Sequence, residues 1–169
     1  SVVQAKLGLS LLALGNTHEA ERALSLAVKN GEVGEANYGL GKVHLALGRY
    51  GEAADQFHAA AAGMSGDARA YAGRGIALAA LGNFDEAIAS FDDGLRANPT
   101  DVETLSNKAL TLALLGSADV ATAMLEDIAQ NGRAGPRDRQ NLALAYLAAG
   151  RRTDAVAMAR LDLDSQAVS

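Results

Sequence analysis

The chain has 169 residues, of which 49% are hydrophobic and only 4% aromatic, and its 15 basic residues against 20 acidic ones leave a net charge of −5. This acidic balance argues against a nucleic-acid binder, which needs a basic face to replace the counterions of phosphate. The chain has no cysteine, which excludes disulfides, thiolate nucleophiles and cysteine-based zinc sites, and no apolar run approaches the eighteen or so residues of a membrane span.

Hydrophobic periodicity, turn glycines and helix-starting polar residues predict an all-α chain made of helix pairs. Ala and Leu, both strong helix formers, are abundant. In chain order the predicted pairs are 2–14 with 17–30, 35–47 with 50–63, 68–81 with 84–97, 102–115 with 118–130, and 137–149 with 152–163.

An internal repeat of about 34 residues sets this arrangement. Turn glycines recur at Gly15, Gly48, Gly82, Gly116 and Gly150. Five residues after each glycine comes an alanine, at Ala20, Ala53, Ala87, Ala121 and Ala155, and seven residues before each comes a small residue, at Gly8, Gly41, Gly75, Ala109 and Ala143. We expect the turn glycines to adopt a left-handed conformation that ends the first helix of each pair, and the small residues to let the paired helices approach closely.

This order of small, large and turn residues resembles the tetratricopeptide repeat (TPR) pattern, W-x2-L-G-x2-Y, then A-x3-F, then P. The third repeat is the fullest match, with Tyr71, Gly75, Leu78, Ala87, Phe91 and Pro99 in place. It departs at Arg74, where the pattern prefers leucine. The resemblance implies a TPR solenoid of five helix-turn-helix repeats in a right-handed superhelical arc, forming a single domain 1–169 with repeats at about 1–33, 34–67, 68–101, 102–135 and 136–169.

Catalytic, cofactor-binding and metal-binding residues are not predicted. The three histidines, His18, His44 and His58, lack a second histidine at i+3 or i+4, the spacing that favours helical metal ligation. His44 falls where the repeat needs a large packing residue, so a core position is predicted. Adjacent acids such as Asp92 and Asp93 point in different directions on a helix, which suits a solvated face better than an acid–base pair. The chain is therefore expected not to be an enzyme.

In TPR families the first helices of successive repeats line the concave face, and that resemblance places a partner-binding groove on this chain. Its predicted residues are Leu9, Leu12, Tyr38, Lys42, Leu45, Ile76, Asn107, Leu110, Gln140, Asn141, Leu144 and Leu147. A largely apolar groove suits an amphipathic helix or an apolar extended segment. Asn107 and Asn141 occupy equivalent positions in adjacent repeats and could hydrogen-bond a peptide backbone. The alternative is that these leucines are inter-helix core and the asparagines make local or solvent contacts.

A narrower resemblance lies in the last repeat. The string RQNLALAYLAAGR at 139–151, followed by ARLDL at 159–163, resembles the C-terminal repeat of TadD-type proteins, which are TPR lipoproteins of the tight-adherence (Flp) pilus machinery. The resemblance implies a periplasmic pilotin, tethered to the outer membrane by an N-terminal lipid, that binds the pilus secretin. The lipidated cysteine of that family is absent from this chain. Ser1 is not a natural initiator, so we expect native sequence upstream of it.

Three function classes remain open at this stage. The first is the pilotin or adaptor that binds a secretin segment in the groove. The second is a cytoplasmic TPR co-chaperone or regulatory adaptor, which a native start without a lipobox cysteine would favour. The third is an enzyme whose catalytic domain lies outside these residues.

Overall fold

The computed structural model describes residues 3–64 and 67–166, and within them the chain is entirely α-helical, with ten helices and no strand. Contacts between residues divide the chain into two compact units, Ser1–Asn98 (unit 1) and Pro99–Ser169 (unit 2), and each unit is described by itself. The predicted all-α fold of five helix pairs is confirmed. The single domain predicted for 1–169 stays a prediction.

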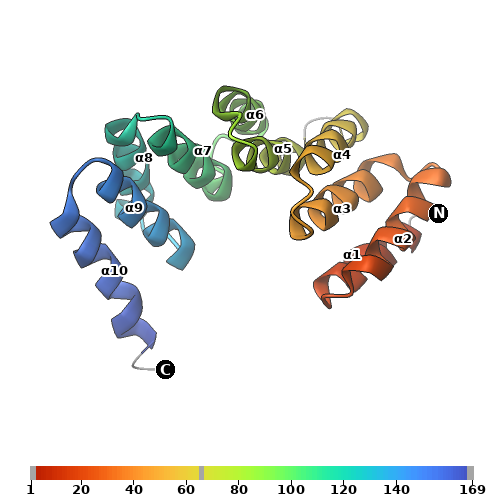
Figure 1. Ribbon diagram of the computed structural model, residues 1–169, viewed down its shortest axis with the longest axis horizontal. Helices are drawn as coiled ribbons and strands as arrows, with labels where there is room; N and C mark the ends of the chain where they lie inside the picture. Colours follow the sequence, from red (N-terminus) through yellow and green to blue (C-terminus); the bar gives the residue numbers. More distant parts are fainter. Residues whose placement is uncertain (1–2, 65–66, 167–169) are drawn as a thin grey trace. The chain divides into compact units, whose positions relative to one another are not determined.

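Unit 1 contains three helix pairs and unit 2 contains two (Figure 1). In unit 1 the helices are α1 (Val3–Ala13), α2 (Thr17–Lys29), α3 (Val33–Ala46), α4 (Tyr50–Gly63), α5 (Ala68–Ala80) and α6 (Phe84–Ala97). In unit 2 they are α7 (Val102–Leu114), α8 (Ala118–Gln130), α9 (Pro136–Ala148) and α10 (Arg152–Gln166). None of these described helices combines the length and apolar character needed to cross a bilayer.

The predicted helix ends agree closely with the structure. The largest difference is at α10, which was expected to end at 163 and ends at Gln166. α3 begins at Val33, two residues before its expected start. The expected start of the first helix at residue 2 lies outside the described residues. A 34-residue repeat therefore locates its helices accurately, because its turn glycines recur at a nearly constant spacing.

All five turn glycines adopt the predicted left-handed conformation, with φ between 71° at Gly48 and 96° at Gly116. After each of them, the next residue's N–H donates to the carbonyl five residues earlier, as from Asn83 to Leu78 at 3.0 Å and from Ser117 to Leu112 at 2.8 Å. These bonds satisfy carbonyls that the helix end leaves unpaired. Glycine is required here because a Cβ is strained at positive φ.

Two helix starts are capped by aspartates that lie 34 residues apart. The Asp67 carboxylate accepts from the Arg69 N–H at 2.9 Å at the start of α5. The Asp101 carboxylate accepts from the Thr104 N–H at 2.8 Å at the start of α7. Asn83 also holds an N-cap position, but its side chain makes no cap bond. The two aspartates therefore stabilise the first helix of the third and fourth repeats.

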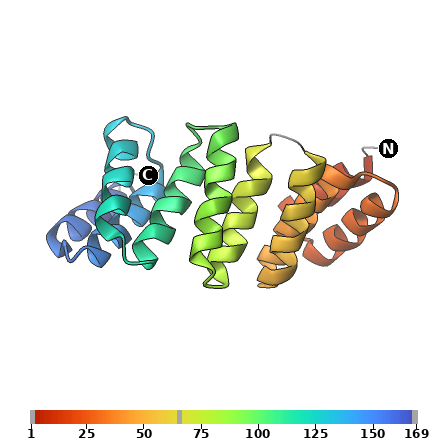
Figure 2. The same ribbon diagram turned by 90° about the horizontal axis from the view of Figure 1, so that it is seen from above.

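The core of unit 1 depends on glycines packed against large side chains. A Cβ at Gly8 would meet Leu24 at 2.4 Å, and a Cβ at Gly75 would meet the ring of Phe91 at 2.5 Å. Phe57 lies within reach of two glycines, since a Cβ would meet its ring at 2.8 Å from Gly41 and at 2.5 Å from Gly73. Figure 2 shows the neighbouring helices of this unit side by side. The predicted close approach of paired helices is confirmed at Gly8, Gly41 and Gly75, whereas Gly73 brings together helices of successive pairs.

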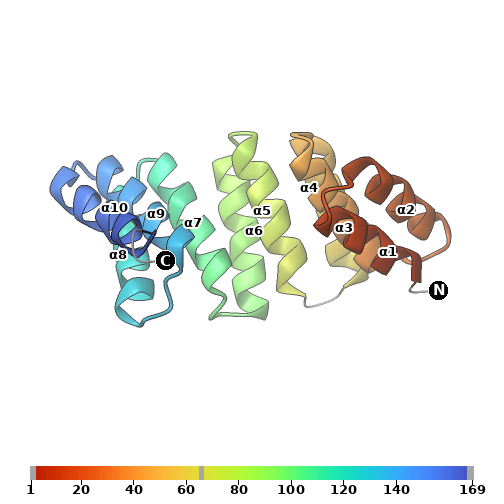
Figure 3. The same cartoon turned by 90° about the horizontal axis from the view of Figure 1, so that it is seen from below.

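Unit 2 has one continuous core that includes Ala109, Leu125, Ile128, Leu142 and Tyr146. Figure 3 shows the four helices α7 to α10 that supply these residues. Leu125 holds the position that Phe91 holds in the preceding repeat, and Ala109 holds that of Gly75. The smaller leucine and the larger alanine thus replace the phenylalanine and glycine of unit 1. Both arrangements fill a helix interface, as close packing requires.

His44, predicted as a core residue, is buried in α3 with 6% of its surface exposed. Its Nδ1 has no hydrogen-bond partner, and the nearest acidic oxygen, Oε2 of Glu52 on α4, lies 3.7 Å away. His18 and His58 are exposed.

Candidate functional site

The residues predicted for a groove belong to two separate faces, one in each unit. The α1/α3/α5 face of unit 1 carries Leu9, Leu12, Tyr38, Lys42, Leu45 and Ile76. The α7/α9 face of unit 2 carries Asn107, Leu110, Gln140, Asn141, Leu144 and Leu147. Each face consists of first helices of successive pairs, which contact one another within their unit.

On the unit 1 face the predicted aliphatic residues are partly buried against the core. Leu9 and Leu12 pack on the cluster that includes Leu24 and Leu40, and Leu45 and Ile76 pack on the cluster that includes Phe57. These four side chains therefore contribute to inter-helix packing as well as to the surface. Each of these side chains thus lies partly in the inter-helix core, as the alternative interpretation predicted for it.

Tyr38 is the aromatic centre of the unit 1 face. Its ring meets that of Phe57 edge to face, with centroids 5.8 Å apart. The Lys42 ammonium lies 5.8 Å and the Arg69 guanidinium 5.0 Å from the centroid of the Tyr38 ring. Two cations at such distances from one aromatic ring are attracted by its quadrupole. They give this face a mixed aromatic and cationic surface.

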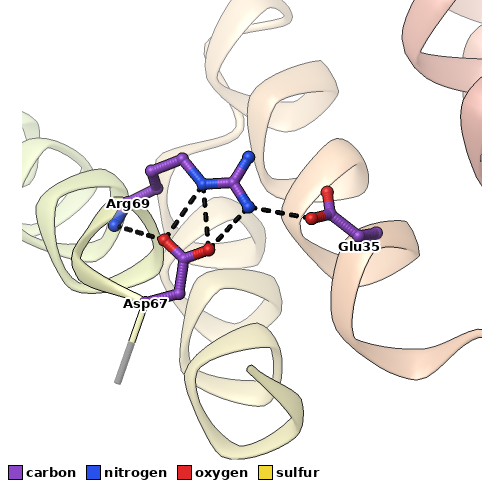
Figure 4. A network of polar contacts seen from close by, with 3 residues as sticks. All are labelled: Glu35, Asp67 and Arg69. Atoms are coloured by element: carbon purple, nitrogen blue, oxygen red, sulfur yellow. Dashed lines mark hydrogen bonds and ion pairs between the residues drawn. The ribbon is translucent and has the colours of Figure 1, made fainter. Parts of the chain in front are cut away.

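Arg69 is held by two acids, one that caps its own helix α5 and one on α3 (Figure 4). Its Nη2 lies 2.6 Å from the Asp67 carboxylate, which caps α5, and 2.8 Å from the Glu35 carboxylate on α3. Hydrogen bonding to Asp67 and then to Glu35 raises the pKa of Arg69 further above its ordinary value. The bond from Arg69 in turn lowers the pKa of Asp67, against the opposing effect of burial. The guanidinium charge is thus matched by two carboxylates before any partner arrives.

On the unit 2 face the predicted apolar residues are more open to solvent. Leu144 is 50% and Leu147 51% exposed, Gln140 is exposed, and Leu110 is half-buried. The spacing of 140, 144 and 147 places these three residues on one side of α9. Exposed leucines grouped with polar residues on one helix face are a feature of surfaces that bind other proteins.

A pocket of about 460 Å³ lies between α7, α9 and the segment that precedes α9. It is lined by Val102, Glu103, Ser106, Asn107, Arg133, Gly135, Arg137, Asp138 and Asn141. Its volume is in the range of sites that hold small molecules or single side chains. Both asparagines that were predicted to bind a peptide backbone line this pocket.

The two asparagines differ in what their amide groups do. The Asn141 Nδ2 donates to the Ser106 hydroxyl oxygen at 2.9 Å, so this amide joins α9 to α7. The Asn107 Nδ2 is buried and has no hydrogen-bond partner. Asn141 therefore makes a local contact, as the alternative interpretation predicted. The Asn107 Nδ2, by contrast, is a donor without a partner.

The charged residues of the pocket are already engaged. The Arg137 guanidinium lies 3.6 Å from the Glu103 carboxylate in an exposed pair. The Asp138 carboxylate accepts from the Gly135 N–H at 2.8 Å, and the Arg133 guanidinium donates to the Thr100 carbonyl. Two acids and two bases leave the lining without net charge.

Sequence reasoning missed part of this pocket. Glu103 and Ser106 lie on α7, and Arg137 and Asp138 lie on α9. Arg133 and Gly135 come from the segment that joins the two repeats. Linker residues do not follow the repeat's offsets, so periodicity carries no signal for them. Within the part of the chain that the structure describes, no group of three or more His, Asp or Glu side chains could hold a metal ion.

Comparison with known proteins gives matches along the chain. A profile of the tetratricopeptide repeat family matches residues 5–68, 43–102 and 72–138, and a second tetratricopeptide repeat profile matches 141–160. No curated protein matches the sequence significantly.

Solved structures share the fold. TTC0263, a thermophilic TPR protein of Thermus thermophilus, superposes with a TM-score of 0.81 at 29% identity, over 95% of this chain and 89% of that one. MamA superposes with a TM-score of 0.75 at 22% identity, over 94% of each chain. YrrB, described as a TPR protein with an unusual peptide-binding site, superposes with a TM-score of 0.70 at 20% identity, over 92% of this chain and 80% of that one.

Proposed function

Because this chain belongs to the tetratricopeptide repeat family, we propose that it is a non-catalytic scaffold that binds another protein through the faces of its first helices. TPR proteins bind protein partners or peptides, and the family is generally non-catalytic. YrrB, which shares the fold, has a peptide-binding site. A protein partner is therefore the function class that family membership favours.

The observation that carries this proposal is the α7/α9 face of unit 2. Leu144 and Leu147 expose half of their surface there, next to a pocket with a buried, unpartnered amide donor at Asn107. Leucines on a helix face can bury apolar side chains of a partner, and the amide can bond its backbone. An apolar helix or extended segment is the kind of partner that this combination suits.

The more specific part of the proposal is a pilotin or adaptor that binds the secretin of a tight-adherence (Flp) pilus system. Its support is the resemblance of residues 139–151 and 159–163 to the last repeat of TadD-type proteins. On this proposal the protein resides in the periplasm, tethered to the outer membrane by an N-terminal lipid.

The alternative is a cytoplasmic TPR co-chaperone or regulatory adaptor. TPR proteins that grip the acidic C-termini of chaperones carry a clamp of lysine, asparagine and arginine across consecutive first helices. Here Arg69 is matched by Asp67 and Glu35, and Arg137 pairs with Glu103. This pairing favours an apolar partner over an acidic one.

The test measures binding of the purified chain to overlapping synthetic peptides that span a tight-adherence secretin. We expect Leu144→Asp and Leu110→Asp to weaken the best peptide about tenfold or more, which corresponds to roughly 1.4 kcal/mol, because a carboxylate would replace an apolar contact. The matched control is Val120→Asp, which changes a residue of similar exposure (55%) on α8, the second helix of its pair.

Far-UV circular dichroism of each variant separates the two interpretations of these leucines. Unchanged helicity with lost binding supports the face, whereas lost helicity in Leu110→Asp or Leu144→Asp assigns that leucine to the core. If no secretin peptide binds, and the wild-type chain instead retains chaperone C-terminal peptides, the pilotin proposal fails and the co-chaperone alternative takes its place.

A further inference from the structure

We propose that Asn30 is a site of spontaneous deamidation, through a cyclic imide that it forms with Gly31, and that Asn131 is protected from the same reaction by its side-chain hydrogen bonds. Asn30 and Asn131 are the two asparagines of the chain that a glycine follows. Each lies just beyond a second helix, Asn30 after α2 and Asn131 after α8, and each is exposed. The proposal does not depend on which partner the first helices bind.

The reaction requires only the chain itself and water. The Gly31 nitrogen attacks Cγ of Asn30, so the bond between these two atoms forms and the Cγ–Nδ2 bond breaks. The side-chain nitrogen leaves as ammonia and takes the proton of the Gly31 N–H with it. Water then adds to one of the two carbonyl carbons of the imide and opens the ring, which restores the N–H. The product is aspartate or, where the chain continues through the side-chain carbonyl, isoaspartate. A following glycine favours the attack, because it has no Cβ that hinders close approach of its backbone.

The backbone is nearly the same at the two sites. Asn30 has φ −88° and ψ 5°, and Asn131 has φ −79° and ψ 7°. The glycines that follow have positive φ, 88° at Gly31 and 66° at Gly132. The N–H of each glycine donates to the carbonyl three residues earlier, at 3.0 Å from Gly31 and at 3.1 Å from Gly132. The attacking nitrogen must therefore give up an equivalent hydrogen bond at both sites.

The side chains differ. The Asn131 Nδ2 donates to the Asp127 carbonyl oxygen at 2.9 Å and to the Asp127 carboxylate at 3.1 Å. Among the residues that the structure describes, no hydrogen-bond partner holds the Asn30 side chain. Attack requires Cγ to turn toward the nitrogen of the next residue, so two bonds must break at Asn131 and none at Asn30. Two hydrogen bonds of ordinary strength slow such a step by roughly tenfold or more.

Deamidation at Asn30 would weaken the attachment of α1. Two residues further along the chain, the Glu32 carboxylate accepts from the Ala5 N–H at 3.1 Å in the first turn of α1. Isoaspartate adds a methylene to the backbone before Gly31, which moves Glu32 relative to Ala5. Either product also places a negative charge at the carboxyl end of α2, where the helix dipole disfavours it. We therefore expect α1 to open more readily after the reaction.

The test compares the two asparagines in one ageing experiment at mildly alkaline pH. Trypsin separates them, because Asn30 falls in the peptide 30–42 and Asn131 in the peptide 109–133. Mass spectrometry then follows the mass gain that accompanies conversion of an amide to a carboxyl group. In the folded protein we expect Asn30 to convert roughly tenfold faster than Asn131. In guanidinium chloride the rates should become similar, because unfolding removes the bonds to Asp127. Equal rates in the folded protein, or the same ratio in the unfolded chain, would overturn the proposal.

Two variants at exposed positions test the cause and the consequence. Asp127→Ala removes one acceptor of the Asn131 amide, so it should speed the conversion of Asn131 and leave that of Asn30 unchanged. An unchanged rate at Asn131 would mean that its bonds to Asp127 do not protect it. Asn30→Gln is the matched control for ageing, since glutamine would have to form a larger and less favourable ring. After ageing, amide hydrogen exchange should show lost protection in α1 of the wild type but not of Asn30→Gln. Full protection of α1 in chains that have converted at Asn30 would contradict the expected effect on α1.

Discussion

The two units pack the same repeat with different pairs of residues. In unit 1, Phe57 faces Gly73 of the next first helix, and a Cβ at Gly73 would lie 2.5 Å from the phenylalanine ring. In unit 2 the equivalent positions are Leu125 and Asn141, 68 residues further along the chain. Unit 2 thus has a leucine in place of the larger phenylalanine, and it has an asparagine where unit 1 has a glycine with no room for a Cβ.

This exchange changes what each face can do. Where glycine and phenylalanine meet, the interface is filled and apolar, and the polar groups of the unit 1 face gather around Tyr38 and Arg69. In unit 2 polar groups lie between α7 and α9, where the Asn141 amide donates to Ser106 and the Asn107 amide nitrogen is unpartnered. The two faces thus differ in the polar groups that they carry.

The largest expected effect tests the packing of unit 1. Phe57→Ala should destabilise the protein by about 3–5 kcal/mol, because it leaves a cavity between α3, α4 and α5. Amide hydrogen exchange should show the loss of protection in the helices of unit 1 more than in α9 and α10. Equal loss along the whole chain would mean that the two units do not differ in their response. Tyr50→Ala, at a residue 38% exposed on the same helix, is the control and should change stability little.

A change in stability of intermediate size tests whether leucine and asparagine can replace the phenylalanine and glycine of unit 1. Gly73→Asn should cost about 1–3 kcal/mol through overpacking against Phe57, as measured by urea unfolding. The double variant Gly73→Asn with Phe57→Leu reproduces the unit 2 pair, and it should be more stable than the sum of the two single changes predicts. If the changes in the free energy of unfolding were strictly additive, the leucine would not make room for the asparagine. The proposed difference in packing between the units would then be wrong.

The smallest expected effects are changes in stability with pH, which occur at acid pH in unit 1 and at alkaline pH in unit 2. In unit 1 the bond from Arg69 lowers the pKa of Asp67, so this stabilisation is present above the unfolded value of about 3.9 and is lost as the pH falls through the folded pKa. In unit 2 burial, with the hydrogen bond to Glu126, raises the pKa of Tyr146, so its stabilisation is full below about pH 10 and is lost as the pH rises through the folded pKa.

Urea midpoints measured across the pH range check both signs. Asp67→Asn should remove part of the acid loss while keeping an N-cap acceptor for α5, and Tyr146→Phe should remove part of the alkaline loss. A Tyr146→Phe variant with an unchanged alkaline profile would show that another group causes the loss in unit 2.

Much of the fold was predictable because the same sequence features recur in all five repeats. Gly82 and Gly116 alone would be weak turn signals, but five glycines at a 33- or 34-residue spacing predict helix ends to within three residues. Gly41 and Gly75 were predicted to allow close helix contact, and the structure confirms it.

The candidate site was less predictable than the fold. Periodicity placed Asn107 and Asn141 at equivalent positions, yet they differ in hydrogen bonding, and Arg133 and Gly135 of the pocket lie in the segment between two repeats.

The sequence by itself determined the helix pairs, the left-handed turns and the family, since these depend on local backbone preferences and on spacing along the chain. Only the tertiary structure decided which amide is unpartnered, which leucines remain exposed and which charges are already paired. Those properties depend on distances between residues of different helices: the 2.9 Å from Asn141 to Ser106 and the 3.6 Å from Arg137 to Glu103 arise from helix packing. The packing of α7 against α9 thus sets the chemistry of a pocket that the repeat pattern alone does not reveal.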